Sequence, residues 1–174
     1  LKGQAGQGAQ ALRFTILTAA RTGEVIGAQW QEIDFEKQLW IIPKERMKAG
    51  YEHRIALSKA AIELLENLPR ISGHIFPGQK QGKHISNVTM LKTLERMKRD
   101  DLTVHGFRST FRDWIAEKTN SPARMAETAL AHQLKDETER AYQRGDLLEK
   151  RAAMMEAWAR YCDSSKAKVV HLRA

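Results

Sequence analysis

The spacing of apolar residues predicts a mostly helical domain that contains one small antiparallel sheet. Residues 11–20 have the apolar spacing of a mostly buried helix, and Thr22 can cap a second short helix. From Ile33 the pattern changes to that of two strands, which flank a polar turn at residues 36–38. After a loop, residues 53–57 form a third predicted strand. The fold class that follows is α+β, mainly α-helical with a small three-stranded antiparallel sheet.

Signals for helix starts recur along the rest of the chain. Several are a serine or aspartate directly before an apolar-periodic stretch, and a proline follows Ser121, where a helix needs no N–H donor. The predicted helices cover residues 58–68, 86–99, 105–118, 121–132, 137–143 and 146–158. Residues 69–85 are rich in glycine and proline and are expected to form a loop, with room for a short strand at residues 74–76.

Length and composition favour a single folded domain. The chain has 174 residues, of which 42% are hydrophobic, enough to bury a core without disulfides or metals. Residues 1–10 are rich in glycine, glutamine and alanine, which is typical of a linker or a domain boundary. The folded domain is then expected at residues 11–163, followed by a flexible C-terminal tail at residues 164–174.

The charge of the chain favours a polyanionic partner. Lysine and arginine number 29 against 21 acidic residues, which gives a net charge of +8. Because neutralising phosphates releases counterions, nucleic acid fits this surplus, and an anionic membrane surface would attract it too. The single cysteine, Cys162, excludes a disulfide or a cysteine-cluster zinc site within the chain and suits a reducing cytosol. No apolar stretch approaches the ~18 residues of a membrane span.

Two arginine motifs are candidates for binding a phosphate. Cleaving a phosphodiester without a metal ion requires positive charge on its non-bridging oxygens, a nucleophile and a proton donor. Arg21 lies in a predicted turn with Glu24 three residues later, where the carboxylate can orient the guanidinium. His105 and Arg108 are spaced to share one face of a helix. Each motif alone is also common on a solvated surface, so neither identifies an enzyme by itself.

Three further residues gain meaning only from their order in the chain. Lys48 follows the second predicted strand, His132 ends a helix rich in small residues, and Tyr142 comes ten residues later. Taken singly they are typical of a solvated lysine, a helix-terminal histidine and a packing tyrosine.

The order of all these motifs resembles the tyrosine recombinases of the phage integrase family, in particular the integrases of prophages and genomic islands. The matching stretches are ARTGEVIGAQWQEIDF, RMKAGYEHRIALS, HGFRSTFRDWIAE, LAHQ and AYQRGDLLEKRAAMMEAWARYC. They extend from about Leu12 to Cys162, which is nearly the whole chain. The resemblance implies the catalytic-domain fold of these DNA breaking and rejoining enzymes.

The resemblance implies a role for each matching side chain. Arg21 and Arg108 would clamp the scissile phosphate, and Glu24 would support Arg21. His105 and His132 would donate hydrogen bonds to the phosphate, and His105 is a candidate to help deprotonate the nucleophile.

The resemblance also implies the nucleophile and the proton donor. Tyr142 would attack phosphorus and leave a 3′-phosphotyrosyl link with a free 5′ hydroxyl. Lys48 would protonate the departing 5′ oxygen, and Lys44 in the same loop is the alternative donor. Because the covalent bond retains the energy of the phosphodiester, neither ATP nor a metal or other cofactor is expected.

Two positions depart from the family pattern. Ala131 stands where the family usually has glycine before the histidine, and a left-handed backbone there would be strained. Ala56 stands where proline is common in the third strand, which costs some rigidity.

The implied partner is double-stranded DNA that carries attachment sites. The residues predicted to contact the DNA backbone are Lys44, Lys80, Lys83, Lys92, Arg96, Lys98 and Arg99. The isolated domain is expected to be a monomer that binds DNA weakly, and the full-length protein a tetramer on DNA in the bacterial cytosol, with no membrane association. A catalytically inactive DNA-binding module and a type IB topoisomerase-like enzyme are the alternatives.

Overall fold

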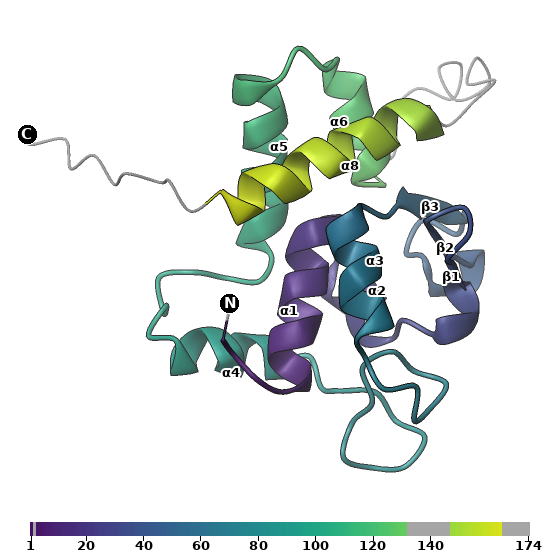
Figure 1. The fold of residues 1–174 in the computed structure, drawn as a ribbon, viewed down its shortest axis with the longest axis vertical. Helices are drawn as coiled ribbons and strands as arrows, with labels where there is room; N and C mark the ends of the chain where they lie inside the picture. The colour runs from purple at the N-terminus through teal and green to yellow at the C-terminus, as the bar shows by residue number, and fades with distance from the viewer. Residues whose placement is uncertain (2, 132–146, 165–174) are drawn as a thin grey trace, which may run out of the picture.

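The computed structural model describes residues 1, 3–131 and 147–164, which form a mostly helical fold with one three-stranded antiparallel sheet (Figure 1). The fold class predicted from the apolar pattern is therefore confirmed. The elements in chain order are α1 (Gln7–Thr18), α2 (Thr22–Ile26), η1 (Trp30–Glu32), β1 (Ile33–Asp34), β2 (Leu39–Ile42), η2 (Lys44–Arg46), β3 (His53–Ala56), α3 (Lys59–Glu66), α4 (Thr89–Arg96), α5 (Gly106–Lys118), α6 (Ala123–Ala129) and α8 (Leu148–Asp163). The short elements η1 and η2 are 3₁₀ helices. The helix predicted at residues 137–143 lies outside the described residues.

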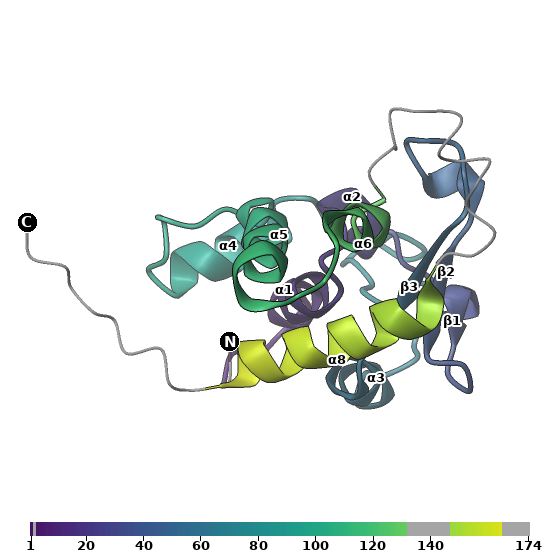
Figure 2. The same ribbon diagram turned by 90° about the horizontal axis from the view of Figure 1, so that it is seen from above.

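Helix α1 runs through the middle of the molecule. Figure 2 shows it between α3 and α8 on one side and α4, α5 and α6 on the other. Its side chains Leu12 and Phe14 are fully buried, and the Phe14 ring lies 5.2 Å from the ring of Trp40 on β2. Helix α1 thus packs against the sheet as well as against the other helices.

The chain enters α1 earlier than its composition indicates. The linker predicted at residues 1–10 is wrong for residues 7–10, because α1 begins at Gln7 and buries Gly8 and Ala9. A Cβ atom at Gly8 would lie 2.8 Å from the carbonyl oxygen of Thr89 and 2.7 Å from Thr93 Oγ1. Glycine therefore lets α1 approach α4 closely, and small residues that are typical of a linker here mark tight helix packing.

The sheet has the order β1-β2-β3, and both strand pairs are antiparallel. Ile33 pairs with Trp40 across the predicted turn, and Ile42 pairs with His53. Ala56, at the position noted for its missing proline, pairs with Leu39. All three predicted strands are therefore confirmed.

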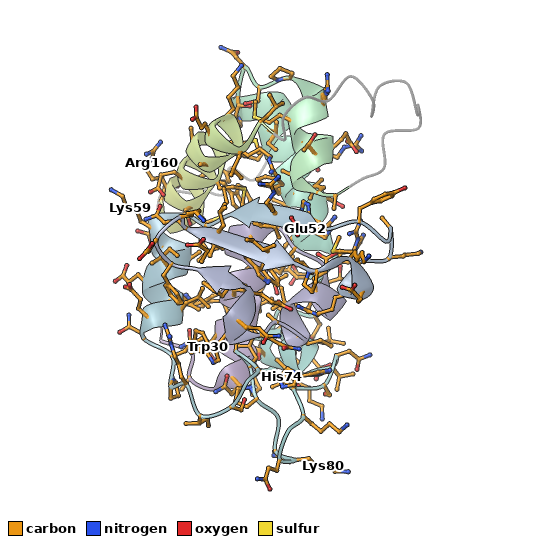
Figure 3. The ribbon with its side chains drawn as sticks, turned by 90° about the vertical axis from the view of Figure 1, so that its right-hand side faces the viewer. Trp30, Glu52, Lys59, His74, Lys80 and Arg160 are labelled. Atoms are coloured by element: carbon orange, nitrogen blue, oxygen red, sulfur yellow. The ribbon has the colours of Figure 1, made fainter. Side chains whose placement is uncertain are left out.

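The glycine-rich loop after α3 returns to the 3₁₀ helix η1. His74 forms a single antiparallel bridge with Gln29, so the short strand suggested at residues 74–76 is not present. The N–H of Trp30 donates to the carbonyl of Gly73 at 3.0 Å, and Figure 3 shows Trp30 and His74 close together. These backbone contacts hold residues 73 and 74 of the loop against η1.

Of three helix starts predicted from a capping side chain, at Thr22, Ser58 and Ser86, only the one at Ser58 is confirmed. Ser58 caps α3 as expected, since its Oγ accepts the N–H of Ala61 at 3.3 Å. The cap predicted at Thr22 is wrong, because Arg21 is the N-cap of α2. The start predicted at Ser86 is also wrong: α4 begins at Thr89, and the Ser86 hydroxyl lies 3.1 Å from the Thr89 hydroxyl.

Helices α5, α6 and α8 enclose a second apolar core beside the one around α1 and the sheet. The Trp158 ring lies 5.2 Å from the Phe111 ring and 5.6 Å from the ring of Tyr161. Trp158 Nε1 also donates to the carbonyl oxygen of Ile16 at 2.7 Å, which ties α8 to α1. Because Tyr161 extends this packing, α8 continues past Trp158 to Asp163. None of the helices in the part of the chain described is long and apolar enough to cross a membrane.

Candidate active site

Arg21 is held at the start of α2 by Glu24. Its backbone N–H donates to Glu24 Oε2 at 2.8 Å, and its Nη1 donates to Glu24 Oε1 at 2.7 Å. Glu24 is buried, whereas 33% of the Arg21 side chain remains exposed. One carboxylate therefore caps the helix and aims a partly exposed guanidinium.

Arg108 projects from α5 into the interior, where only 5% of the residue is exposed. Its Nη1 donates to the carbonyl oxygen of Ala19, and its Nη2 donates to that of Leu130 at 2.8 Å. Burial, and secondly the positive charge of Arg21 nearby, lower the pKa of Arg108 to about 10. The guanidinium thus stays charged at neutral pH while two backbone carbonyls fix its orientation.

The arginines converge on one turn at the C-terminal end of α6. Arg21 Nη2 donates to the carbonyl oxygen of Ala131 at 3.2 Å, next to the Leu130 carbonyl that Arg108 binds. His53 on β3 joins them, since its Nε2 lies 3.2 Å from the carbonyl oxygen of Ala129. The last carbonyls of a helix lack partners within it and form its negative end, so cationic and N–H donors are favourable there.

Three consecutive carbonyls are therefore each bound by a side chain from a different element: β3, α5 and the start of α2. We call residues 129–131 with these three side chains the carbonyl anchor. The chain continues from this anchor directly into His132, and both His132 and Tyr142 lie outside the described residues.

Ala131 closes the carbonyl anchor in a left-handed conformation, with φ +48°. A side chain with a Cβ is disfavoured there by about 1–2 kcal/mol, which glycine avoids. The strain expected for alanine at this position is thus present in the backbone.

Replacing Ala131 with glycine is expected to stabilise the domain by about 0.5–1 kcal/mol, because relief of the strain exceeds the entropy cost of glycine in the unfolded chain. Thermal unfolding should show a rise in Tm of about 1–4 °C. Ala126→Gly, within α6, should change Tm in the opposite direction, since its backbone is helical. A lower Tm for Ala131→Gly would contradict the prediction.

The other two described candidates lie on the surface. His105 is the N-cap of α5, one turn before Arg108, and its side chain is exposed. Lys48 is exposed on the loop between η2 and β3. The structure describes no hydrogen bond that joins either side chain to the arginines, so their roles stay predictions.

Arg46 holds the start of the Lys48 loop against α2, a role that the sequence did not reveal. Its Nη1 binds Glu32 Oε1 at 2.5 Å, and its Nη2 donates to the carbonyl oxygen of Glu24 at 2.5 Å. The buried Glu32 also accepts Trp40 Nε1 at 2.9 Å. A Cβ atom at Gly27 would lie 3.0 Å from Arg46 Nη2, so glycine leaves space for this network.

The residues predicted to contact DNA divide into two groups. Four of them line one groove of about 740 Å³ beside the N-terminal end of α1, and we call it the basic groove; they are Lys80, Lys83, Lys92 and Arg96. The remaining three, Lys44, Lys98 and Arg99, do not line it. Arg99 instead forms two hydrogen bonds of 2.8 Å with Asp101.

Comparisons with known proteins identify the family to which the chain belongs. The chain matches the phage integrase family over residues 5–147. It is 37% identical over 167 residues to the prophage integrase IntA of Escherichia coli K12, covering 91% of this chain and 40% of that protein. It is 33% identical over 182 residues to the integrase of Enterobacteria phage P4, covering 93% of this chain and 42% of that protein.

The fold is also that of a solved integrase. The structure of the integrase from mycobacterium phage Brujita matches with a TM-score of 0.69 at 20% sequence identity, covering 88% of this chain and 52% of that chain. The chain spans about two fifths of the length of the two curated relatives named above. Since the phage integrase family model matches residues 5–147, which is most of the chain, the chain belongs to the phage integrase family.

Proposed function

We propose that this chain is the catalytic domain of a tyrosine recombinase, which cuts and rejoins DNA through a 3′-phosphotyrosyl bond at Tyr142. The observation that supports it most directly is that Arg21 and Arg108, far apart in the chain, bind adjacent carbonyls of one turn. That turn precedes the segment which carries His132 and Tyr142. Membership of the phage integrase family supports the same activity.

The two guanidinium groups supply the charge that phosphoryl transfer needs. Each has five N–H donors, and its bonds to the described residues use one Nη1 and one Nη2 donor, so that three donors of each group have no acceptor among those residues. Negative charge builds on the non-bridging oxygens as the phosphate is attacked, and fixed donors stabilise it without reorganisation. Arg21, which is partly exposed, presents the accessible edge of the pair.

The reaction then needs only side chains of the protein. The phenol of Tyr142 loses its proton, for which His105 is the candidate base, and its oxygen attacks phosphorus. The bond from phosphorus to the 5′ oxygen breaks, and Lys48 gives its proton to that oxygen. A 5′ hydroxyl that attacks the phosphotyrosyl bond reverses these steps and rejoins the strand. Lys44 is the alternative proton donor.

The basic groove is proposed to bind the DNA backbone away from the scissile phosphate. It lies at the N-terminal end of α1, whereas Ala19 and Arg21 follow its C-terminal end. A helix of 12 residues is about 18 Å long, so the two sites would contact different phosphates of one duplex. Figure 3 shows Lys80 at the tip of the loop that projects from one end of the molecule, well away from Glu52 beside β3.

The double substitution Lys92→Gln/Arg96→Gln is expected to weaken DNA binding uniformly across sequences. Each lost phosphate contact should reduce the slope of log K against log salt by about 0.9. Fluorescence anisotropy at several salt concentrations measures this slope, with Lys59→Gln on α3 as the control that removes a charge outside the groove. An unchanged slope in the double variant would remove the basic groove from the DNA interface.

A nicked suicide DNA substrate tests the proposed activity. Full-length integrase should accumulate a covalent protein–DNA adduct that survives denaturation, and Tyr142→Phe should abolish it. Binding without an adduct would favour an inactive DNA-binding module, and cleavage without preference for attachment-site DNA would favour a topoisomerase-like enzyme. We also propose that the isolated domain is a monomer, and that the full-length protein acts as a tetramer on DNA in the bacterial cytosol. Light scattering of the isolated domain and of the full-length protein, each with and without DNA, tests the two oligomeric states.

A further inference from the structure

His53 is a buried histidine on β3 that the roles above do not use. Only 8% of it is exposed, and its Nε2 lies 3.2 Å from the carbonyl oxygen of Ala129. Because a carbonyl only accepts hydrogen bonds, Nε2 must carry the proton in this contact. His53 is therefore a fixed N–H donor to the first carbonyl of the carbonyl anchor.

The surroundings of His53 keep its ring uncharged. Burial, followed by the positive charge of Arg151 on α8, lowers the pKa of His53 to about 4, while Glu24 on α2 and the Ala129 carbonyl oppose the shift and Arg21 adds to it. The ring is therefore neutral at physiological pH, and it acts by its hydrogen bond and its shape.

Strand β3 is tied to the second core at two successive residues. His53 binds the end of α6, and the carbonyl oxygen of Arg54 accepts Arg151 Nη1 of α8 at 2.7 Å. The sheet is thus the fixed platform for the α6 turn, and the Leu130 and Ala131 carbonyls that orient Arg108 and Arg21 lie on that turn.

We propose that His53 is a positioning residue, whose Nε2–H bond to Ala129 fixes the turn that orients Arg21 and Arg108 against the scissile phosphate. This inference rests on the proposed recombinase function. Without the bond, the turn at the end of α6 loses its side-chain tie to the sheet, and the Leu130 and Ala131 carbonyls no longer hold the two guanidinium groups at fixed positions. Small misplacements of fixed catalytic groups slow the chemical step more than they weaken substrate binding.

The test compares side chains that differ in reach at position 53 of the full-length integrase. Glutamine can place an N–H near the position of Nε2, asparagine is too short, and leucine has no donor. With a suicide attachment-site substrate at saturating concentration, His53→Leu and His53→Asn should form the adduct at least about tenfold more slowly, and His53→Gln should recover to within about threefold of the unmodified rate. DNA affinity should change by less than about twofold in all three variants, because the phosphate contacts of the basic groove remain.

A pH profile separates positioning from proton transfer. The ratio of the His53→Gln rate to the unmodified rate should stay constant from pH 6 to 9, because neither side chain titrates there. A ratio that changes with pH, equal rates for Asn and Gln variants, or an unmodified rate for His53→Leu would each overturn the inference. If leucine prevents folding, the polar pair Asn and Gln still decides between the outcomes.

Failure of this inference is distinct from failure of the proposed function. An unmodified integrase that forms no adduct, or one whose adduct persists in Tyr142→Phe, refutes the function itself. An unmodified integrase that forms the adduct normally while His53 variants do the same refutes only the role of His53.

Discussion

Integrase carrying Arg108→Lys is expected to form the covalent DNA adduct about 10²–10³-fold more slowly than the unmodified protein. The Arg108 guanidinium is buried and donates to the Ala19 and Leu130 carbonyls, so its place and orientation are both fixed. Lysine has a single ammonium group without a planar fork, and it cannot bind two carbonyls and a phosphate in the same geometry. The loss should appear in the single-turnover rate at saturating DNA.

Arg112→Lys is the matched control on the same helix. Arg112 lies one turn after Arg108, and its exposed side chain pairs with Glu127 at 2.9 Å. Surface ion pairs contribute about 0–1 kcal/mol, so this variant should cleave at the unmodified rate. If Arg108→Lys also cleaved within about threefold of that rate, the phosphate clamp assigned to Arg108 would be wrong.

The free energy of unfolding is expected to fall on the order of 3 kcal/mol between pH 6.5 and pH 4 because of His53 alone. The folded-state pKa of His53 is lowered from 6.5 to about 4, chiefly by burial and then by Arg151. Between these values the unfolded chain binds more protons than the folded one, so stability increases with pH. The contribution is complete above pH 6.5 and is lost as the pH falls towards 4.

Urea unfolding at a series of pH values measures this effect, with His53→Gln as the comparison. Glutamine does not titrate, so the free energy of unfolding of the variant should depend less on pH across this range. Other groups around the ring, namely Glu24, Arg21 and Arg151, are common to both proteins, so their own titration cancels to first order. Equal pH slopes for the two proteins would show that the His53 ring takes up a proton as readily when folded as when unfolded.

The sequence predicts most of the fold because its signals are local. Alternating apolar residues and a polar turn determine the three strands, and the hydroxyl of Ser58 suffices to start α3. Errors arise where distant packing decides. The early start of α1 depends on contact between Gly8 and α4, and the extension of α8 depends on aromatic rings around Tyr161.

The candidate site divides in the same way. Arg21 with Glu24 is a local motif, and the sequence shows it directly. The contribution of His53 is not visible locally, because its partner Ala129 lies 76 residues later. The sequence offers one indication of this role, which is that His53 occupies an inward-facing position of β3. A buried polar side chain in a strand requires a hydrogen-bond partner. Arg46 is similar, because its partner Glu32 is on another element.

The carbonyl anchor would make the proposed DNA cleavage depend on complete folding. Its three bonds join residues separated by 76, 22 and 110 positions in sequence, and they come from the sheet, α5 and the start of α2. Such long-range contacts form late, after the loops between them have closed. A nascent or partly unfolded chain therefore contains Tyr142 without the organised pair of arginines that the proposed reaction requires, and it is expected to leave DNA uncut.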